Sequence, residues 1–182
     1  MKKLPGVVII NSKVFKDLRG FFLETYSPKI LKKIGISDKF IQDNHSRSKK
    51  NVLRGLHYQI NNPQSQIVTL LRGKIYYVVV DLRKKSPTFS QWNAFYLSET
   101  NSRQLYIPPG VASGFCTLSN YADIHYKVSQ LYNNKDEGGI LWNDSYLNIK
   151  WPIKKPIINK RDKSFPNFKD IVSHKLPKNI KK

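Results

Sequence analysis

The fold of this chain is decided by the stretch Ile75-Tyr76-Tyr77-Val78-Val79-Val80-Asp81-Leu82. Apart from Asp81, its side chains are β-branched, aromatic or aliphatic, and such side chains fit the packed surface of a sheet. A short apolar run without polar alternation is typical of a strand that is buried on both faces. We therefore expect a central strand here, preceded by a turn at Gly73.

Further strand-like segments lie on either side of this run at regular intervals. They are residues 66–71, 91–97, 103–107, 112–118 and 124–131, with turn-forming residues between them. Short strands that recur every ~8–12 residues indicate an all-β sandwich or barrel. The residues alone therefore predict a small antiparallel β-barrel, organised as a single domain over residues 1–182.

Only two regions depart from this pattern. Near the N-terminus, residues 27–35 predict a short helix, because Ser27 can cap it, Pro28 suits its first turn and Gly35 suits its end. From Trp151 onward the chain is rich in proline and lysine. We expect this C-terminal segment to be irregular or weakly helical.

Composition and charge narrow the classes of function. No apolar run approaches the ~20 residues that cross a bilayer, and Cys116 is the only cysteine, which favours a reducing, cytoplasmic setting. The formal net charge is +20, but the lysines are scattered in pairs and no familiar nucleic-acid motif is present. We therefore expect a small anionic ligand, with neither a nucleic acid nor a membrane as partner.

The stretch from Asn51 to Gln59 combines an arginine, a glycine and a histidine within apolar surroundings. Strict alternation along a strand would put Arg54 and His57 on opposite faces. A bulge at Gly55 would bring both side chains towards one cavity. Histidine titrates near neutrality, so this arrangement could hold an anion beside a proton acceptor.

A second candidate lies in the run Ile124-His125-Tyr126-Lys127-Val128. Tyr126 shares a strand face with Ile124 and Val128, so we expect it to point inward, whereas His125 faces the surface. An inward phenol is either a tyrosine satisfied within the core or a proton donor.

Taken together, several segments resemble the dTDP-4-dehydrorhamnose 3,5-epimerase family, cupin-like enzymes of nucleotide-sugar metabolism. The segments are residues 54–59, 108–115, 123–128, 141–144 and 149–152. The resemblance extends from about Val14 to Pro166. It implies an antiparallel jelly-roll, cupin-like barrel, isomerase activity without a cofactor, and a cytoplasmic homodimer. The implied pathway is dTDP-rhamnose biosynthesis for lipopolysaccharide and other cell-surface polysaccharides.

The resemblance also implies roles for three residues. His57 is the base that removes a sugar proton, Tyr126 is the acid across the sugar ring, and Asp162 is the carboxylate that orients the histidine. Epimerisation beside a ketone needs one group to accept a proton and another to donate one on the opposite face. The implied reaction converts dTDP-4-dehydro-6-deoxy-D-glucose to dTDP-4-dehydro-L-rhamnose, through an enolate, at C3 and C5.

Two positions depart from the family pattern. Gln66 stands where the family usually has a lysine, and Ser113 stands where it usually has a histidine. Losing one donor to an oxyanion commonly costs ~10²–10³ in rate. Besides a slower epimerase, the departures leave open an enzyme for a single carbon or a different nucleotide sugar, and a non-catalytic sugar-nucleotide-binding protein.

Nucleotide binding is implied by the similarity of residues 17–24 and 42–46 to family segments. The resemblance places Arg19 on the diphosphate and Phe22 and Glu24 on the nucleotide, often across a dimer interface. It implies further substrate contacts from Gln42, Asn44, Arg54, Gln66, Ser113, Tyr132, Glu137 and Arg161, with Tyr132 stacking on the thymine.

A metal site is not expected. The chain has four histidines, and their spacing does not match a cupin metal motif, which would need His-x-His with a further histidine and a glutamate. We therefore predict a site free of metal and of cofactor.

Overall fold

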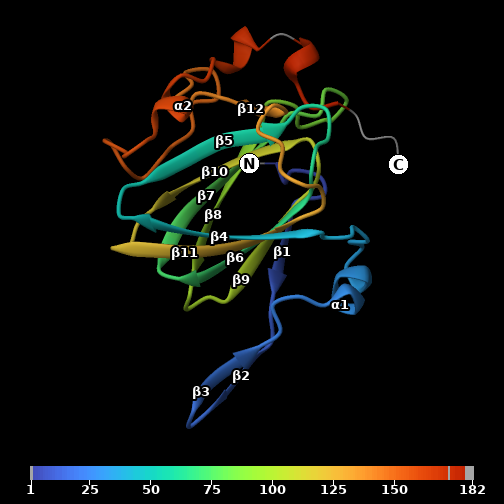
Figure 1. The fold of residues 1–182 in the computed structure, drawn as a ribbon, viewed down its shortest axis with the longest axis vertical. Helices are drawn as coiled ribbons and strands as arrows, with labels where there is room; N and C mark the ends of the chain where they lie inside the picture. Colours follow the sequence, from blue (N-terminus) through green and yellow to red (C-terminus); the bar gives the residue numbers. More distant parts are fainter. Residues whose placement is uncertain (1, 172, 179–182) are drawn as a thin grey trace.

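The computed structural model describes residues 2–171 and 173–178, and its centre is a sandwich of two antiparallel β-sheets (Figure 1). The first sheet contains, in spatial order, β1 (Val8–Asn11), β9 (Arg103–Ile107), β6 (Gln66–Arg72), β11 (Tyr121–Val128) and β4 (Gln42–Lys49). The second contains β12 (Glu137–Gly139), β5 (Leu53–Gln59), β10 (Val111–Thr117), β7 (Lys74–Asp81) and β8 (Trp92–Ser98). The expected all-β, cupin-like architecture is confirmed.

Strand β7 is buried on both faces, as its sequence predicts. Tyr77 and Val79 pack into the core between the two sheets. Val78 and Val80 face the other way and pack against residues that include Phe168 of the C-terminal segment. That segment is irregular apart from α2 (Lys160–Lys163), η1 (Phe168–Asp170) and η2 (Ser173–Lys175). It covers the outer face of the second sheet and packs apolar side chains against it (Figure 1).

The predicted helix is α1 (Pro28–Lys33), with Pro28 in its first turn and Gly35 just beyond its end at φ +81°. Ser27 occupies the N-cap position, but within the described chain its side chain makes no capping hydrogen bond. Leu31 is the buried residue of this helix. It joins a small cluster beside β1 and β9, so packing rather than capping holds the helix in place.

A two-stranded hairpin, β2 (Val14–Asp17) and β3 (Gly20–Leu23), projects away from both sheets (Figure 1). Its aromatic side chains are largely open to solvent, with Phe21 and Phe22 each 68% exposed. An isolated hairpin of this kind is only marginally stable in water. An exposed apolar surface of this kind often marks a site of interaction with another molecule.

The strands that the sequence predicts lie close to their observed positions. The largest difference is at β11, which begins at Tyr121 rather than at residue 124. Strand β4 was not predicted, because its sequence, residues 42–49, has no apolar face; its full-length pairing with β11 holds it in the sheet. Among the described residues, no helix is long and apolar enough to cross a membrane.

Candidate active site

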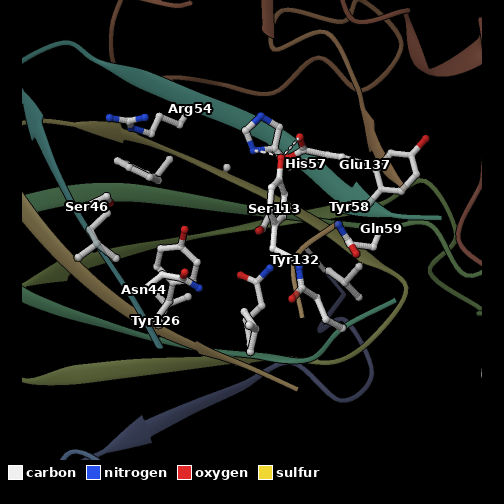
Figure 2. A pocket seen from close by; sticks show the side chains of 18 of the residues that line it. Asn44, Ser46, Arg54, His57, Tyr58, Gln59, Ser113, Tyr126, Tyr132 and Glu137 are labelled. Atoms are coloured by element: carbon white, nitrogen blue, oxygen red, sulfur yellow. Dashed lines mark hydrogen bonds and ion pairs between the residues drawn. The ribbon is translucent and has the colours of Figure 1, made fainter. Parts of the chain in front are cut away.

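A cavity of about 310 Å³ opens between the two sheets, at the lower end of the ~300–1,000 Å³ typical of small-molecule sites (Figure 2). Strands β4, β6 and β11 form one wall, and β5, β7 and β10 form the other. Its apolar lining comes from core residues such as Val68, Phe115 and Ile124. Polar side chains surround this apolar floor, so the cavity suits a ligand with a compact ring and several oxygen atoms.

A bulge in β5 directs both Arg54 and His57 into this cavity. In the pairing with β10, Arg54 lies opposite Phe115 and His57 lies opposite Ser113, so β5 has one extra residue between them. The extra length is accommodated at Gly55, where φ is +117° and an added Cβ would lie only 2.5 Å from the Cα of Gly114. The bulge expected at Gly55 is therefore confirmed, and only glycine fits there.

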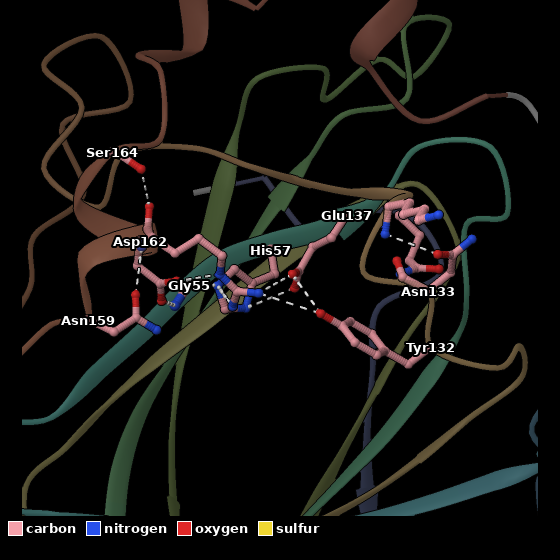
Figure 3. A network of polar contacts seen from close by, with 11 residues as sticks. Gly55, His57, Tyr132, Asn133, Glu137, Asn159, Asp162 and Ser164 are labelled. Carbon is pink, nitrogen blue, oxygen red and sulfur yellow. Dashed lines mark hydrogen bonds and ion pairs between the residues drawn. The ribbon is translucent and has the colours of Figure 1, made fainter.

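His57 is hydrogen-bonded to a buried carboxylate. Its Nε2 lies 3.0 Å from Oδ1 of Asp162, whose side chain is fully buried (Figure 3). Asp162 Oδ2 accepts a hydrogen bond from the Gly55 N–H at 2.9 Å, and the Asp162 N–H donates to Oδ1 of Asn159, the N-cap of α2. These contacts fix the carboxylate, and through it the tautomer and orientation of the imidazole.

Asp162 is held in its charged form. Burial pushes the pKa of its carboxyl upward, but hydrogen bonds from His57 and Gly55, together with the charges of His57 and Arg161, outweigh burial and lower the pKa to about 2. An anion therefore sits behind the imidazole throughout the neutral range. It favours the imidazolium that forms when His57 accepts a proton.

A second carboxylate, from Glu137, faces the other ring nitrogen of His57. Glu137 Oε1 lies 3.8 Å from His57 Nδ1, while Oε2 accepts a hydrogen bond from the Tyr132 hydroxyl at 2.9 Å (Figure 3). Arg161 forms ion pairs with both carboxylates, and its Nε lies 3.3 Å from Asp162 Oδ1. The imidazole thus lies within a charged network at the cavity rim.

Tyr126 enters the cavity from β11, in the sheet opposite to the one that carries His57 (Figure 2). It shares its strand face with Ile124 and Val128, which also line the cavity, as the alternation predicts. Burial raises the pKa of the Tyr126 phenol, and the positive charge of Arg54 offsets only part of that rise. The phenol is therefore protonated near neutral pH and can donate a proton.

The two positions that depart from the family pattern both line the cavity. Gln66 lies on β6 and offers a neutral amide. Ser113 lies on β10, is 8% exposed, and accepts a hydrogen bond from the Tyr77 hydroxyl at 3.2 Å. Tyr77, expected only as part of a buried strand, also lies in the cavity wall. The signal was present, because a phenol within an aliphatic run must find a hydrogen-bond partner.

The other residues expected to contact substrate fall into two groups. One group lies at the cavity: Gln42, Asn44, Arg54, Tyr132, Glu137 and Arg161. The other group lies on the projecting hairpin or just after it: Arg19, Phe22 and Glu24. Arg19 is almost fully exposed and pairs with Asp17 at 2.6 Å. One chain therefore brings together the first group but not the second.

Two glutamines at the cavity were not anticipated. The side-chain carbonyl oxygens of Gln59 and Gln64 are buried, and among the described residues neither has a hydrogen-bond partner. Buried acceptors of this kind are costly unless a ligand or water donates to them.

In residues 2–171 and 173–178, no cluster of three or more His, Cys, Asp or Glu side chains is arranged to hold a metal ion.

The chain is similar to known proteins over most of its length. The family model described as dTDP-4-dehydrorhamnose 3,5-epimerase matches residues 1–170. The dTDP-4-dehydrorhamnose 3,5-epimerase of Salmonella typhimurium is 48% identical over 166 residues, which cover 90% of this chain and 91% of the relative.

Solved structures are similar over nearly the whole chain. The dTDP-6-deoxy-D-glucose-3,5-epimerase of Legionella pneumophila, in complex with dTDP-4-keto-L-rhamnose, superposes with a TM-score of 0.94 at 40% identity, covering 99% of this chain and 97% of that one. The dTDP-4-dehydrorhamnose 3,5-epimerase of Bacillus anthracis, with TDP and pyrophosphate bound, gives a TM-score of 0.88 at 41% identity, covering 91% and 99%.

Proposed function

Because the chain belongs to the dTDP-4-dehydrorhamnose 3,5-epimerase family and is an isomerase with that activity, we propose that His57, Tyr126 and Asp162 carry out its proton transfers. The observation that carries this proposal is the position of His57 and Tyr126 on opposite walls of one cavity, with Asp162 fixed 3.0 Å behind the imidazole. A base and an acid on either side of a sugar ring are what inversion at a carbon requires.

The reaction begins at a carbon next to the C4 ketone. His57 takes the proton, the C–H electron pair forms a C=C bond, and the carbonyl π electrons move onto the C4 oxygen, which becomes an enolate. Tyr126 then gives its phenolic proton to the opposite face of the same carbon, and the ketone is restored. His57 and Tyr126 return to their starting states by exchanging protons with water. The same ketone acidifies both C3 and C5, so one pair of residues serves both carbons in turn.

The substrate is a dTDP-linked 4-keto-6-deoxyhexose, as the ligand of the Legionella pneumophila structure supports. Arg54 and Arg161 at the cavity supply guanidinium groups for the diphosphate. Tyr132, at the rim and half exposed, is placed to stack on the thymine. The net charge of +20 attracts such an anion from solution. We also propose a cytoplasmic location, which the buried free thiol of Cys116 supports.

The active form is a homodimer in which each hairpin completes the nucleotide site of the other chain. Arg19, Phe22 and Glu24, which resemble nucleotide-binding residues, are on or beside a hairpin that points away from its own cavity. The apolar surface of that hairpin also needs a cover. Both features support exchange of the hairpin between two copies.

Subunit complementation tests this exchange. One variant is His57→Asn, and the other combines Arg19→Ala, Phe22→Ala and Glu24→Ala. If the hairpin acts in trans, each mixed dimer has one intact site, so equal mixing and reassembly of the two inactive proteins restores about a quarter of wild-type activity. If the hairpin acts on its own chain, every site remains defective and activity stays at background.

The reaction itself is tested with dTDP-4-keto-6-deoxyglucose in deuterated water. We expect deuterium at both C3 and C5 of the product, because each new C–H bond takes its hydrogen from a solvent-exchanged phenol. Label at one carbon would identify the single-carbon epimerase that Gln66 and Ser113 leave open. Label at neither carbon would overturn the proposal and favour a binding protein.

A further inference from the structure

Two hydroxyl groups at the cavity wall form a hydrogen-bonded pair that the proposed proton transfers do not use. Tyr77 on β7 donates to Ser113 Oγ on β10 at 3.2 Å, and both side chains are more than nine-tenths buried. Both residues line the same cavity as His57 and Tyr126. Buried polar groups are costly unless they are hydrogen-bonded, and this contact gives the Tyr77 hydroxyl hydrogen its acceptor.

The strand register puts this pair next to the reacting group. Ser113 is directly opposite His57 in the pairing of β10 with β5. Directly opposed residues have Cα atoms ~4.5–5.5 Å apart and side chains on the same face of the sheet. The Ser113 hydroxyl therefore opens onto the part of the cavity that the imidazole reaches.

One of the two hydroxyl hydrogens of this pair remains available for a ligand. The Tyr77 hydroxyl hydrogen is used on Ser113 Oγ, and among the described residues the Ser113 hydroxyl hydrogen has no acceptor. The Tyr77 ring is fixed by stacking on Phe115, with centroids 6.1 Å apart and planes at 11°. Burial raises the pKa of the Tyr77 phenol well above its ordinary value, so the phenol remains a hydrogen-bond donor near neutral pH.

We propose that Ser113 donates its free hydroxyl hydrogen to the C4 oxygen of the sugar, and that Tyr77 is a positioning residue that orients and polarises Ser113. The relay runs from the Tyr77 O–H to the Ser113 O–H to the oxygen that becomes the enolate. Its premise is the proposed function, since that reaction creates the oxyanion. Linked hydroxyl groups in a buried site strengthen one another as charge develops on the acceptor. The relay thus supplies neutral donors in a cavity wall where Gln66 brings no charge.

The test compares Ser113→Ala, Tyr77→Phe and the double variant in steady-state kinetics. We expect Ser113→Ala to lower kcat by about 10–100-fold, near the lower range for loss of one oxyanion donor. Tyr77→Phe lowers kcat by less, about 3–10-fold, because Ser113 keeps its own hydrogen. The double variant matches Ser113→Ala, since Tyr77 acts only through Ser113. KM and the affinity for dTDP, which lacks the sugar, stay within about twofold of wild type in all three.

The matched control is Tyr106→Phe. Tyr106 is also a buried tyrosine, but its hydroxyl bonds Asp38 at 2.7 Å. Its replacement is expected to change thermal stability and leave kcat unchanged. Should Tyr77→Phe fail to fold, Ser113→Ala alone decides the donor step, because it removes one oxygen atom from a small side chain.

Failure of the relay can be told apart from failure of the proposed function. A wild-type protein without epimerase activity overturns the function, and the relay with it. An active wild type that loses turnover with His57→Asn, but keeps wild-type kcat with Ser113→Ala, overturns the relay alone. The relay would also be overturned if Ser113→Ala and Tyr77→Phe lowered kcat equally and their effects multiplied in the double variant. Independent effects would mean that the two hydroxyls do not act in series.

Discussion

The sugar end of the cavity and the hairpin formed by β2 and β3 are built in opposite ways. At the sugar end, His57, Ser113 and Tyr126 stand on strands in the interior of the sandwich, and each is fixed by packing or by hydrogen bonds from its neighbours. The hairpin carries Arg19 in its turn and Phe22 on β3, and its two short strands form no ladder with either main sheet within the described chain. One region is complete within a single chain, and the other awaits a partner surface.

This difference separates chemistry from recognition. Proton transfer tolerates little error in distance, so its groups belong on rigid elements. Nucleotide binding draws on charge and stacking, which a flexible element can supply after the partner has docked. Changes at the sugar end should therefore act on kcat, and changes on the hairpin should act on KM and on assembly.

The largest effect is expected from His57→Asn. Removing the base should lower kcat by about 10³–10⁴, the upper range for general acid–base catalysis, while dTDP affinity changes little. Steady-state kinetics and calorimetric titration with dTDP measure both. His125→Asn is the control, because His125 pairs with Asp43 on the outer side of β11. A kcat within tenfold of wild type for His57→Asn would contradict the assignment of the base.

Asp162→Asn is expected to lower both kcat and the stability of the protein. The amide can no longer favour the imidazolium, so kcat should fall by about 10²–10³. The variant also loses pH-dependent stability. The pKa of Asp162 in the folded protein is about 2, below its ordinary value of 3.8, so its contribution to stability is present above pH 3.8 and disappears as the pH falls towards 2.

Denaturant unfolding at several pH values measures that second effect. The difference in unfolding free energy between wild type and Asp162→Asn should be constant near neutrality and shrink between pH 4 and pH 2. A difference that does not change with pH would mean that the carboxylate is not held in its charged form by His57 and Gly55.

On the hairpin, Arg19→Ala is expected to raise KM by about tenfold, the loss of one charge-assisted contact to phosphate, with kcat within threefold of wild type. Stability should be unaffected, because Arg19 is 90% exposed and bonds only its neighbour Asp17 in the described structure. Lys16→Ala on the same hairpin serves as a charge-matched control. A fall in kcat without a rise in KM would show that the two regions are not functionally separate.

The smallest effect is expected from Gln66→Lys. A positive charge near the enolate oxygen should raise kcat by about two- to tenfold if Gln66 faces that oxygen. Gln66→Met, of similar size and without charge, is the control. An unchanged or lower kcat with lysine would show that the enolate oxygen lies at the Tyr77–Ser113 pair and out of reach of a cation at position 66.

Most of the fold could be predicted from the sequence, and the reasons are local. Residues 75–82 are apolar on both faces, and the strands around them recur at regular spacing, so β6 to β11 were found near their observed bounds. Strand β4 could not be found, because residues 42–49 are polar throughout and owe their conformation to pairing with β11. Tertiary hydrogen bonding, rather than propensity, decides such a strand.

The residues of the site could be predicted from the sequence, but the hydrogen bonds between them could not. The resemblance brought His57, Tyr126 and Asp162 together, and Gly55 pointed to the bulge. The full burial of Asp162 and its bond to the Gly55 N–H depend on the packing of α2, which lies more than a hundred residues further along the chain. The Tyr77–Ser113 contact joins neighbouring strands 36 residues apart, so no local pattern contained it.

If His57 and Tyr126 act on opposite faces of the same carbon, Tyr126→Phe in deuterated water should separate proton removal from inversion. With the acid removed, His57 can still take a proton from the substrate and return a deuteron to the same face. We predict that recovered substrate gains deuterium with its configuration unchanged, while product formation falls by about 10²-fold or more. The parallel His57→Asn sample should gain none. Product formation at the wild-type rate by Tyr126→Phe, or deuterium uptake by His57→Asn, would mean that these two residues are not the acid and the base.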